Sequence, residues 1–422
     1  MISRRRFVAL SSAVAVAPLF LNARVLGRSR PGPSNALGLG FIGVGIQGRS
    51  LLNTLKKRDA VRILAVCDVD SDRRLDAKKR VDTAYENSDC AAFGHHADLL
   101  AHPGIDAVVI ASPDHWHAHH VLDAAAAGKD IYCEKPLSLN LHEARVMIEG
   151  VRKHGRVFQT GSQQRSEYAG RFRTACEYVR SGRLGAVSTI HVGIGDTARP
   201  CDLGAENAPE GLDWDRWLGP APLRPYNSIL SPRGVHDHYP RWRDYREYSG
   251  GMITDWGAHH FDIVQWALGA DGSGPVRALP PREPGSLRGA RLIYPGGVEA
   301  VHDGPFGITF IGEKGVIYVD RDRVESIPGD ILRKPLGDKD IHLAKATGHM
   351  QNWLDCIRTR EPCICDVEIG ARSVACCHLM NLAYWHGRPL TWDPTKWEFP
   401  GDDEANGWRD YQRRAGYELP TI

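Results

Sequence analysis

Three side chains that lie far apart in the sequence could together act on an alcohol group. Asp255 and His259 are four residues apart, so on one helix they share a face and the carboxylate can orient or charge-stabilise the imidazole. Histidine has the basicity to accept a hydroxyl proton near neutral pH. Lys135, within Glu134-Lys135-Pro136, can neutralise or hydrogen-bond a hydroxyl as it loses that proton. Each motif alone also fits a structural role: a surface lysine, a capping aspartate or a buried histidine.

A glycine-rich segment near the start of the chain fits the phosphate-binding turn of a dinucleotide site. Residues 43–48 read Gly-Val-Gly-Ile-Gln-Gly and lie between an apolar strand at 37–42 and a helical pattern. The first glycine permits a tight turn, the second lets a pyrophosphate approach the backbone, and the third lets the helix pack closely on the sheet. The helix N-terminus adds unpaired amides and a positive dipole. The predicted contacts are Gly43, Gly45, Ile46, Gln47 and Gly48.

An acidic residue indicates which dinucleotide the site prefers. Asp68 ends the next apolar strand, 20 residues beyond Gly48. A carboxylate at this position can bind the ribose hydroxyls and repels a 2′-phosphate, which favours NAD. Arg73 and Arg74 follow closely, so NADP stays open.

Later strands should end at the same ligand crevice, because the carboxyl ends of parallel strands share one edge of the sheet. The cofactor contacts expected there are Ser112, Pro113, His117, Glu134 and Lys135. Residues 114–120 include four histidines, some at helical ligand spacing. No distant carboxylate or cysteine set completes a metal site, so we expect no metal and expect this segment to shape the nicotinamide pocket.

Strand and helix patterns alternate up to about residue 160 and then give way to β-rich segments. The sequence predicts an α/β protein, with a doubly wound parallel Rossmann sheet over 36–160. Residues 161–422 should form an α+β domain with a large, mostly antiparallel sheet. Helices are predicted at 171–180, 346–359 and 367–386, and a hairpin turn at 313–315.

An insertion at about 196–247 is rich in tryptophan, proline and arginine. Exposed indoles there could stack on sugar faces, or buried indoles could staple loops together, and both readings remain open. The candidate substrate contacts are Gln163, Arg165, Trp242 and His260.

The sequence pattern of the first 35 residues predicts that the protein is exported. Ser3-Arg4-Arg5-Arg6-Phe7 precedes an apolar run to residue 21 that is too short for an ordinary membrane span, as in a twin-arginine signal, and a linker follows. We expect delivery by the twin-arginine translocation machinery to the periplasm or another extracytoplasmic site. Cleavage and an uncleaved anchor both stay open. That machinery carries folded proteins, so a cofactor would leave with the enzyme and be regenerated on it.

Composition limits the partners. The 422 residues carry a formal net charge of +2, so nothing indicates nucleic acid. Ten cysteines form no CxxC pair and suit buried thiols.

These motifs resemble the glucose–fructose oxidoreductase/inositol dehydrogenase/rhizopine-catabolism (Gfo/Idh/MocA) family. The resemblance rests on the glycine motif at 43–48, Pro113-x-x-x-His117, residues 134–136 and Asp255-x-x-x-His259. It implies that Lys135, Asp255 and His259 are the catalytic trio, oxidising a ring hydroxyl with NAD(P). It also implies a cis Lys135–Pro136 peptide and a homo-oligomer built through the second sheet.

Three functions follow from these expectations. The first is an oxidoreductase that transfers hydride from a hydroxyl-bearing carbon of a sugar, cyclitol or sugar derivative, with a tightly held cofactor. The second is a redox-neutral glycoside hydrolase that oxidises, eliminates, adds water and reduces. The third is a non-catalytic sugar-binding protein, which the intact trio disfavours.

Overall fold

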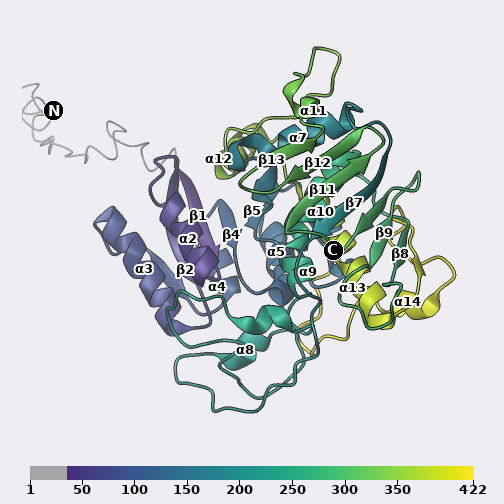
Figure 1. The fold of residues 1–422 in the computed structure, drawn as a ribbon. Coiled ribbons are helices and arrows are strands. Elements are labelled where there is room, and N and C mark those ends of the chain that lie inside the picture. Colours follow the sequence, from purple (N-terminus) through teal and green to yellow (C-terminus); the bar gives the residue numbers. More distant parts are fainter. Residues whose placement is uncertain (1–35) are drawn as a thin grey trace, which may run out of the picture.

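The computed structural model describes residues 36–422, which form two sheets joined by helices (Figure 1). The proposed signal and linker, residues 1–35, lie outside the described residues. Within the described part, every helix is too short or too polar to cross a membrane.

The N-terminal sheet is parallel throughout, and its strand order is β3-β2-β1-β4-β5-β6. The strands are β1 Leu37–Ile42, β2 Val61–Cys67, β3 Ala91–Phe93, β4 Ala107–Ile110, β5 Asp130–Cys133 and β6 Phe158–Thr160. The helices between them are α2 Ile46–Leu55, α3 Ser71–Tyr85, α4 His96–Leu100, α5 His117–Ala126 and α6 Leu141–Lys153. β4 is buried along its whole length, as its continuous apolar run requires. The predicted Rossmann sheet is confirmed, and its strand order reverses between β1 and β4, where such sheets bind ligands.

The second sheet has eight strands in the order β13-β12-β11-β7-β10-β9-β8-β14. The strands are β7 Val187–Gly193, β8 Arg277–Leu279, β9 Arg291–Ile293, β10 Glu299–Val301, β11 Gly307–Gly312, β12 Gly315–Val319, β13 Val324–Ile327 and β14 Leu390–Thr391. All pairings are antiparallel except that of β7 with β10, so the predicted mostly antiparallel sheet is confirmed. The β11–β12 hairpin turns where the sequence predicts it.

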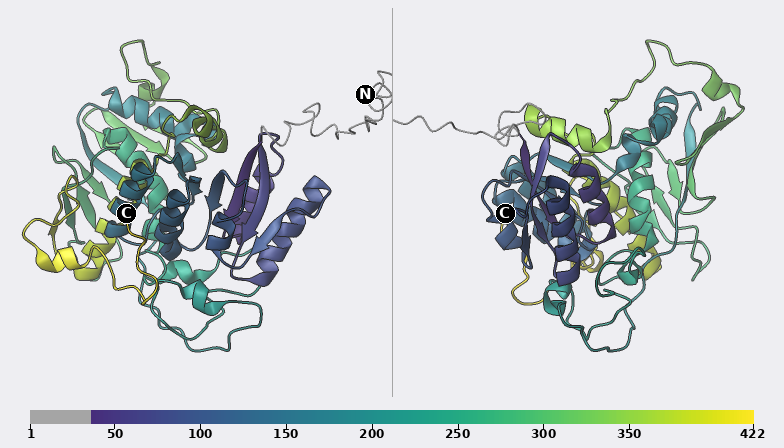
Figure 2. Two further views of the ribbon diagram at one scale, coloured as in Figure 1. Left: turned by 180° about the vertical axis from the view of Figure 1, so that it is seen from behind. Right: turned by 90° about the vertical axis from the view of Figure 1, so that its left-hand side faces the viewer.

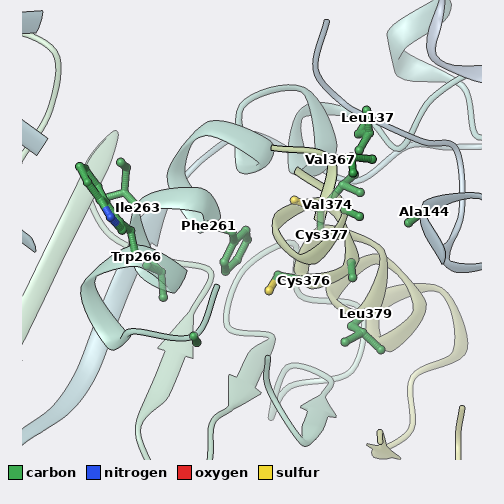
Figure 3. Packing of buried hydrophobic residues seen from close by; sticks show 14 of the residues in the cluster. Leu137, Ala144, Phe261, Ile263, Trp266, Val367, Val374, Cys376, Cys377 and Leu379 are labelled. Atoms are coloured by element: carbon green, nitrogen blue, oxygen red, sulfur yellow. The ribbon is translucent and has the colours of Figure 1, made fainter. Parts of the chain in front are cut away.

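Further helices belong to the C-terminal half of the chain. They are α7 Arg171–Arg180, α9 Met252–Asp255, α10 Gly257–Leu268, α11 Asp330–Arg333, α12 His349–Thr359, α13 Val367–His386 and α14 Asp403–Gly407. α13 packs against both α6 and α10, and one hydrophobic cluster includes side chains from both halves of the chain (Figure 3). α12 packs on the Rossmann half through the fully buried Trp353. This shared core fixes α10 relative to the strand ends of the Rossmann sheet.

The insertion consists mainly of loops, with one short helix, α8 Trp214–Leu218, and one 3₁₀ turn, Arg241–Asp244. In Figures 1 and 2 these teal loops lie along the lower side of the molecule, beneath the Rossmann half. Trp217 and Trp242 are 4% and 6% exposed and belong to a small hydrophobic cluster of their own. For these two indoles the staple interpretation is therefore confirmed, and exposed sugar-stacking faces are wrong.

All ten cysteines are free thiols, and nine of them are buried. Burial raises the pKa of these thiols; it raises that of Cys376 to about 12, which keeps the group protonated and unreactive.

Candidate active site

The glycine-rich loop between β1 and α2 leaves room for a ligand. Gly43 has a φ of 80°, and a Cβ there would lie 2.6 Å from the backbone N of Ser112. A Cβ on Gly48 would lie 2.1 Å from the carbonyl O of Gly43, so this glycine lets α2 pack on the loop. A Cβ on Gly45 would meet nothing within 4 Å. The loop backbone therefore faces an open space at the start of a helix, as a phosphate site requires.

Asp68 forms one wall of the pocket beside this loop. Its carboxylate accepts hydrogen bonds from the backbone N–H groups of Val44 (3.0 Å) and Asp70 (2.9 Å). Burial raises the pKa of Asp68, and the positive charge of Arg73 opposes that rise. Arg73 itself donates to the carbonyl oxygens of Pro232 and Gly234, so its guanidinium is held by the insertion.

The insertion covers this pocket. The Rossmann loops line one side of the pocket, and the insertion lines the other. The insertion residues in the wall are Arg216, Trp217, Leu230, Ser231, His236, Tyr239, Pro240, Trp242 and Arg243. Ser112, Pro113, Ile46 and Gln47 line the Rossmann side, with the glycines of the loop.

A buried carboxylate anchors the insertion to the start of α3. Asp70 is fully buried and caps α3 by accepting from the backbone N–H groups of Asp72 and Arg73. It also accepts from the backbone N–H of Gly234 (2.8 Å) and from the guanidinium of Arg233. Burial alone would raise the pKa of Asp70, but these hydrogen bonds and nearby positive charges hold it below its ordinary value.

The histidine-rich segment at 114–120 is mainly a platform for other chain segments. His115 Nε2 and the Trp116 indole N–H lie 3.0 and 3.1 Å from the carbonyl O of Trp217 in the insertion. His119 Nε2 lies 2.7 Å from the carbonyl O of Tyr417 near the C-terminus. Among residues 36–422, no three His, Cys, Asp or Glu side chains are grouped so that they could hold a metal ion.

His117 lies behind the pocket wall. Its Nδ1 is 2.7 Å from the carbonyl O of Pro136 and its Nε2 is 2.9 Å from that of Ser112. Burial lowers its pKa to about 4, so the ring is neutral. His117 thus braces two backbone segments of the site, the second of them in the pocket wall.

Lys135 and Asp255 form an ion pair across the two halves of the chain. Lys135 Nζ lies 2.7 Å from Asp255 Oδ1 and 3.1 Å from the Asp255 carbonyl O, and the Lys135–Pro136 peptide is cis. Arg243 Nε approaches the same carboxylate at 3.7 Å. Burial would raise the pKa of Asp255, but the charges of Lys135 and Arg243 hold it below its ordinary value.

The expected pairing of Asp255 with His259 is wrong. α9 ends at Asp255 and a separate helix, α10, begins at Gly257, so the two residues do not share one continuous helix. Asp255 turns to Lys135 instead.

His259 is buried with a free ring nitrogen. Its side chain is 4% exposed, and Nδ1 has no hydrogen-bond partner among the described residues. Burial, followed by the charges of Lys135 and Arg321, holds the pKa of His259 well below its ordinary value. The imidazole is therefore neutral at physiological pH and able to accept a proton.

Glu134 connects the cofactor loop to the strand ends. Its carboxylate accepts from Gln47 Nε2 (2.9 Å), the Tyr132 hydroxyl (3.2 Å) and Gln163 Nε2 (3.3 Å). Burial raises the pKa of Glu134, and the charge of Lys135 opposes this. Gln163, a predicted substrate contact, is therefore held at the edge of the cofactor site.

Arg165 is misassigned as a substrate contact. Its side chain is 1% exposed, and its guanidinium nitrogens are all engaged by Asp262 and Asp271. Four of its five N–H groups donate within this buried network, so the protein itself holds the side chain.

The other two substrate candidates differ. His260 is 1% exposed and packs against Phe306 at 5.1 Å between ring centroids, which is a packing position. Burial lowers its pKa to about 3. Trp242 lines the cofactor pocket, with the Arg243 guanidinium 4.1 Å from its ring centroid.

Sequence reasoning missed Arg321. It follows β12, and its guanidinium carbon lies 4.7 Å from the Tyr168 ring centroid and 4.4 Å from that of Trp256. No spacing motif marks it, because its neighbours come from two other segments of the chain.

Comparison with known proteins identifies the family of the chain. Two models of the Gfo/Idh/MocA family match: "Oxidoreductase family, NAD-binding Rossmann fold" over residues 37–162, and "Oxidoreductase family, C-terminal alpha/beta domain" over residues 198–419.

Individual proteins extend the comparison. The chain is 27% identical to the myo-inositol 2-dehydrogenase of Thermotoga maritima over 323 residues, covering 71% of this chain and 79% of that protein. It is 28% identical over 233 residues to a glycosyl hydrolase family 109 protein of Stenotrophomonas maltophilia, covering 51% of this chain and 49% of the other. The fold also matches the crystal structure of myo-inositol 2-dehydrogenase from Lactobacillus plantarum, with a TM-score of 0.56 and 19% identity, covering 84% and 99% of the two chains. Matched in both of its halves, the chain belongs to the Gfo/Idh/MocA family of oxidoreductases and carries its NAD-binding Rossmann fold.

Proposed function

We propose that the protein oxidises a CH–OH group of a sugar, cyclitol or sugar derivative and keeps its cofactor bound throughout. The observation that carries this proposal is the buried, neutral His259 beside the Lys135–Asp255 ion pair. A non-catalytic sugar-binding protein would have no use for such a base. Similarity to the Thermotoga inositol dehydrogenase supports a polyhydroxylated ring as substrate.

The residues present suit NAD. The open backbone at Gly45 and the start of α2 fit a pyrophosphate, and the Asp68 carboxylate fits the ribose hydroxyls. Because the carbonyl oxygens of the insertion already hold Arg73, this side chain is poorly placed to attract a 2′-phosphate. We therefore favour NAD over NADP.

The protein's own residues would move the proton. NAD held by the glycine loop and Asp68 would supply the acceptor for the hydride that leaves the substrate carbon. His259 would take the hydroxyl proton, since its ring is neutral and its Nδ1 has no hydrogen-bond partner among residues 36–422. The Lys135 ammonium stabilises the oxygen as negative charge develops, and Asp255 holds that ammonium in place at 2.7 Å.

Retention of the cofactor is the second part of the proposal. The insertion covers the pocket and is anchored by Asp70 and by an Arg49–Asp237 ion pair at 2.7 Å. A covered site slows dissociation, which suits a protein exported in folded form by the twin-arginine route. Outside the cytoplasm the cofactor would be reoxidised in place by a second substrate.

One experiment tests both parts. The protein is purified as expressed, its bound nucleotide is identified after denaturation, and nicotinamide reduction is followed by absorbance on adding myo-inositol or aldoses without free cofactor. We expect stoichiometric bound NAD and substrate-dependent reduction. Protein that emerges fully apo and binds NAD weakly contradicts retention, and absence of reduction by every polyol and sugar contradicts the oxidoreductase.

A redox-neutral glycoside hydrolase is the alternative. Similarity to the family 109 glycosyl hydrolase supports it, and such a cycle, which regenerates NAD on the enzyme, suits a covered cofactor pocket. Release of an aglycone from aryl glycosides with no net nicotinamide reduction distinguishes it from the oxidoreductase.

A further inference from the structure

The substrate side of the site contains an arginine without a protein partner for its charge. The guanidinium of Arg321 forms no hydrogen bond and no ion pair with any of residues 36–422, and its Nε is buried. Buried polar groups are normally hydrogen-bonded, so a buried charged donor without a partner calls for an explanation.

Two aromatic rings hold this guanidinium instead. The rings of Tyr168 and Trp256 approach its carbon at 4.7 and 4.4 Å. Contacts with ring faces attract a cation, but they leave the N–H groups along the guanidinium edge without acceptors. The backbone of Arg321 is fixed as well, because its carbonyl O accepts from Arg171 Nη1 at 3.2 Å.

Nearby carboxylates are already occupied. Asp320 accepts from the backbone N–H groups of Asp322 and Arg323 (2.8 Å each) and from the Tyr318 hydroxyl (2.7 Å). Asp255, the acid of the catalytic site, is bound by Lys135. Neither carboxylate is therefore the hydrogen-bond partner of Arg321.

The position of Arg321 places it beside the proposed base. The Trp256 ring that contacts it also lies 5.7 Å from the His259 ring, between centroids. The charge of Arg321 contributes to lowering the pKa of His259. Neither Arg321 nor its two aromatic neighbours belongs to the wall of the cofactor pocket, so the pyrophosphate is not its partner.

The backbone that presents Tyr168 is unusual. Tyr168 and Ala169 have φ values of 59° and 53°, a conformation that residues with side chains rarely adopt. Strain of this kind persists where surrounding structure enforces it and is concentrated at ligand sites. It sets the aromatic wall that holds Arg321.

We propose that Arg321 binds a carboxylate of the substrate, which makes the substrate a sugar acid, such as a uronate or a glycoside of one. This inference rests on the proposed oxidoreductase function. A carboxylate matches the planar fork of the guanidinium with two parallel hydrogen bonds. One unpaired cation also balances one carboxylate, whereas a phosphate monoester carries about −1.5 to −2 charges at neutral pH.

The test compares matched pairs of sugars on the protein as purified with its cofactor. D-Glucuronate is compared with D-glucose, and D-galacturonate with D-galactose, by kcat/KM and by calorimetric binding. We expect wild-type protein to prefer the acid, and Arg321→Met to lose about 100-fold in kcat/KM on the acid but only about twofold on the neutral sugar. Arg323→Met is the matched control, since its side chain lies two residues away and is 55% exposed.

Every outcome of this comparison either supports or overturns the inference. Equal losses on acid and neutral sugars, unchanged activity of Arg321→Met on the acid, or no uronate binding at all would overturn the inference. If Arg321→Met fails to fold, Arg321→Lys keeps the charge without the fork and should bind the acid with intermediate affinity. Arg321-dependent uronate binding without any oxidation leaves the site standing and refutes the proposed function. Oxidation of neutral sugars without any preference for the acid leaves the proposed function standing and refutes the carboxylate site.

Discussion

Asp70 and Arg73 on the cofactor side differ from His259 and Arg321 on the substrate side in how their polar atoms are paired. On the cofactor side, Asp70 and Arg73 are each bonded to protein groups, many of them in the insertion. On the substrate side, His259 Nδ1 and Arg321 Nε are buried and have no hydrogen-bond partner among residues 36–422. A polar network that is complete within the protein stabilises the structure. An unpaired buried polar group instead destabilises the folded protein until a ligand pairs with it.

This difference teaches where function resides. The cofactor side holds its own loops in place, and we expect changes there to alter retention. The substrate side is incomplete without substrate, and we expect changes there to alter turnover.

The largest expected effect is loss of the base. His259→Ala should lower kcat/KM on the order of 1,000-fold, because the hydroxyl proton then has no positioned acceptor. Bound NAD, measured after denaturation, should stay at the wild-type level. His260→Ala is the neighbouring control, since His260 packs against Phe306. Wild-type turnover by His259→Ala would remove this residue from the mechanism.

The pH profile sharpens the same contrast. Burial and two nearby cations hold the pKa of His259 well below 6.5, so its neutral, proton-accepting form persists at mildly acidic pH. We expect the acid limb of kcat/KM to lie below pH 6.5 in the wild type. An acid limb above that value would contradict this assignment.

Lys135 should have the next largest effect. Lys135→Met should lower kcat/KM about 100-fold, because the developing negative charge on oxygen loses its cation. Removing this positive charge also raises the pKa of His259, so the acid limb should move to higher pH. Lys135→Arg keeps the charge and should leave the limb in place. A limb that does not move in Lys135→Met would separate Lys135 from His259.

Much of this arrangement is predictable from local sequence, because local pattern decides local structure. The helices at 171–180 and 367–386 have the predicted bounds, and the glycine loop follows β1 as expected. These features depend on residues within one or two turns of each other. Short edge strands such as β13 and β14 lack such a pattern, and no prediction identified them.

The side-chain pairings within the site were harder to predict from the sequence. Asp255 pairs with a lysine 120 residues away, and Arg165 is taken up by Asp262 and Asp271 about 100 residues on. Arg321 meets rings from two other segments. Which charges find partners is set by how α10 packs against the Rossmann strand ends, and no spacing rule encodes that packing.

A smaller effect is expected on the cofactor side. Asp70→Asn still caps α3, since asparagine is as good a cap as aspartate, but it weakens the bonds to Arg233 and Gly234. A hydrogen bond to a charged group contributes about 1.5 kcal/mol, so bound NAD should dissociate about tenfold faster. Cofactor release is measured by rapid dilution and fluorescence. Asp76→Asn, which changes a partly exposed pair with Arg80 on the same helix, should have no effect.

If Asp70→Asn instead impaired turnover with unchanged retention, the division of labour between the two sides would be wrong.

The smallest expected effect comes from the buried carboxyl of Asp114, whose pKa is influenced by the charges of Arg243, Asp255 and Lys135. Asp114 is 3% exposed, accepts from the Ser249 hydroxyl at 2.6 Å, and has its pKa raised to about 7, chiefly by burial. Because the folded state then holds a proton that the unfolded state has lost, stability from this group is present at low pH and falls as pH rises through about 7. Asp114→Asn is always neutral and keeps an acceptor for Ser249. Between about pH 5 and about pH 8, its Tm should therefore fall by about 2 to 3 °C less than that of the wild type. Equal falls would show instead that Asp114 is ionised throughout this range.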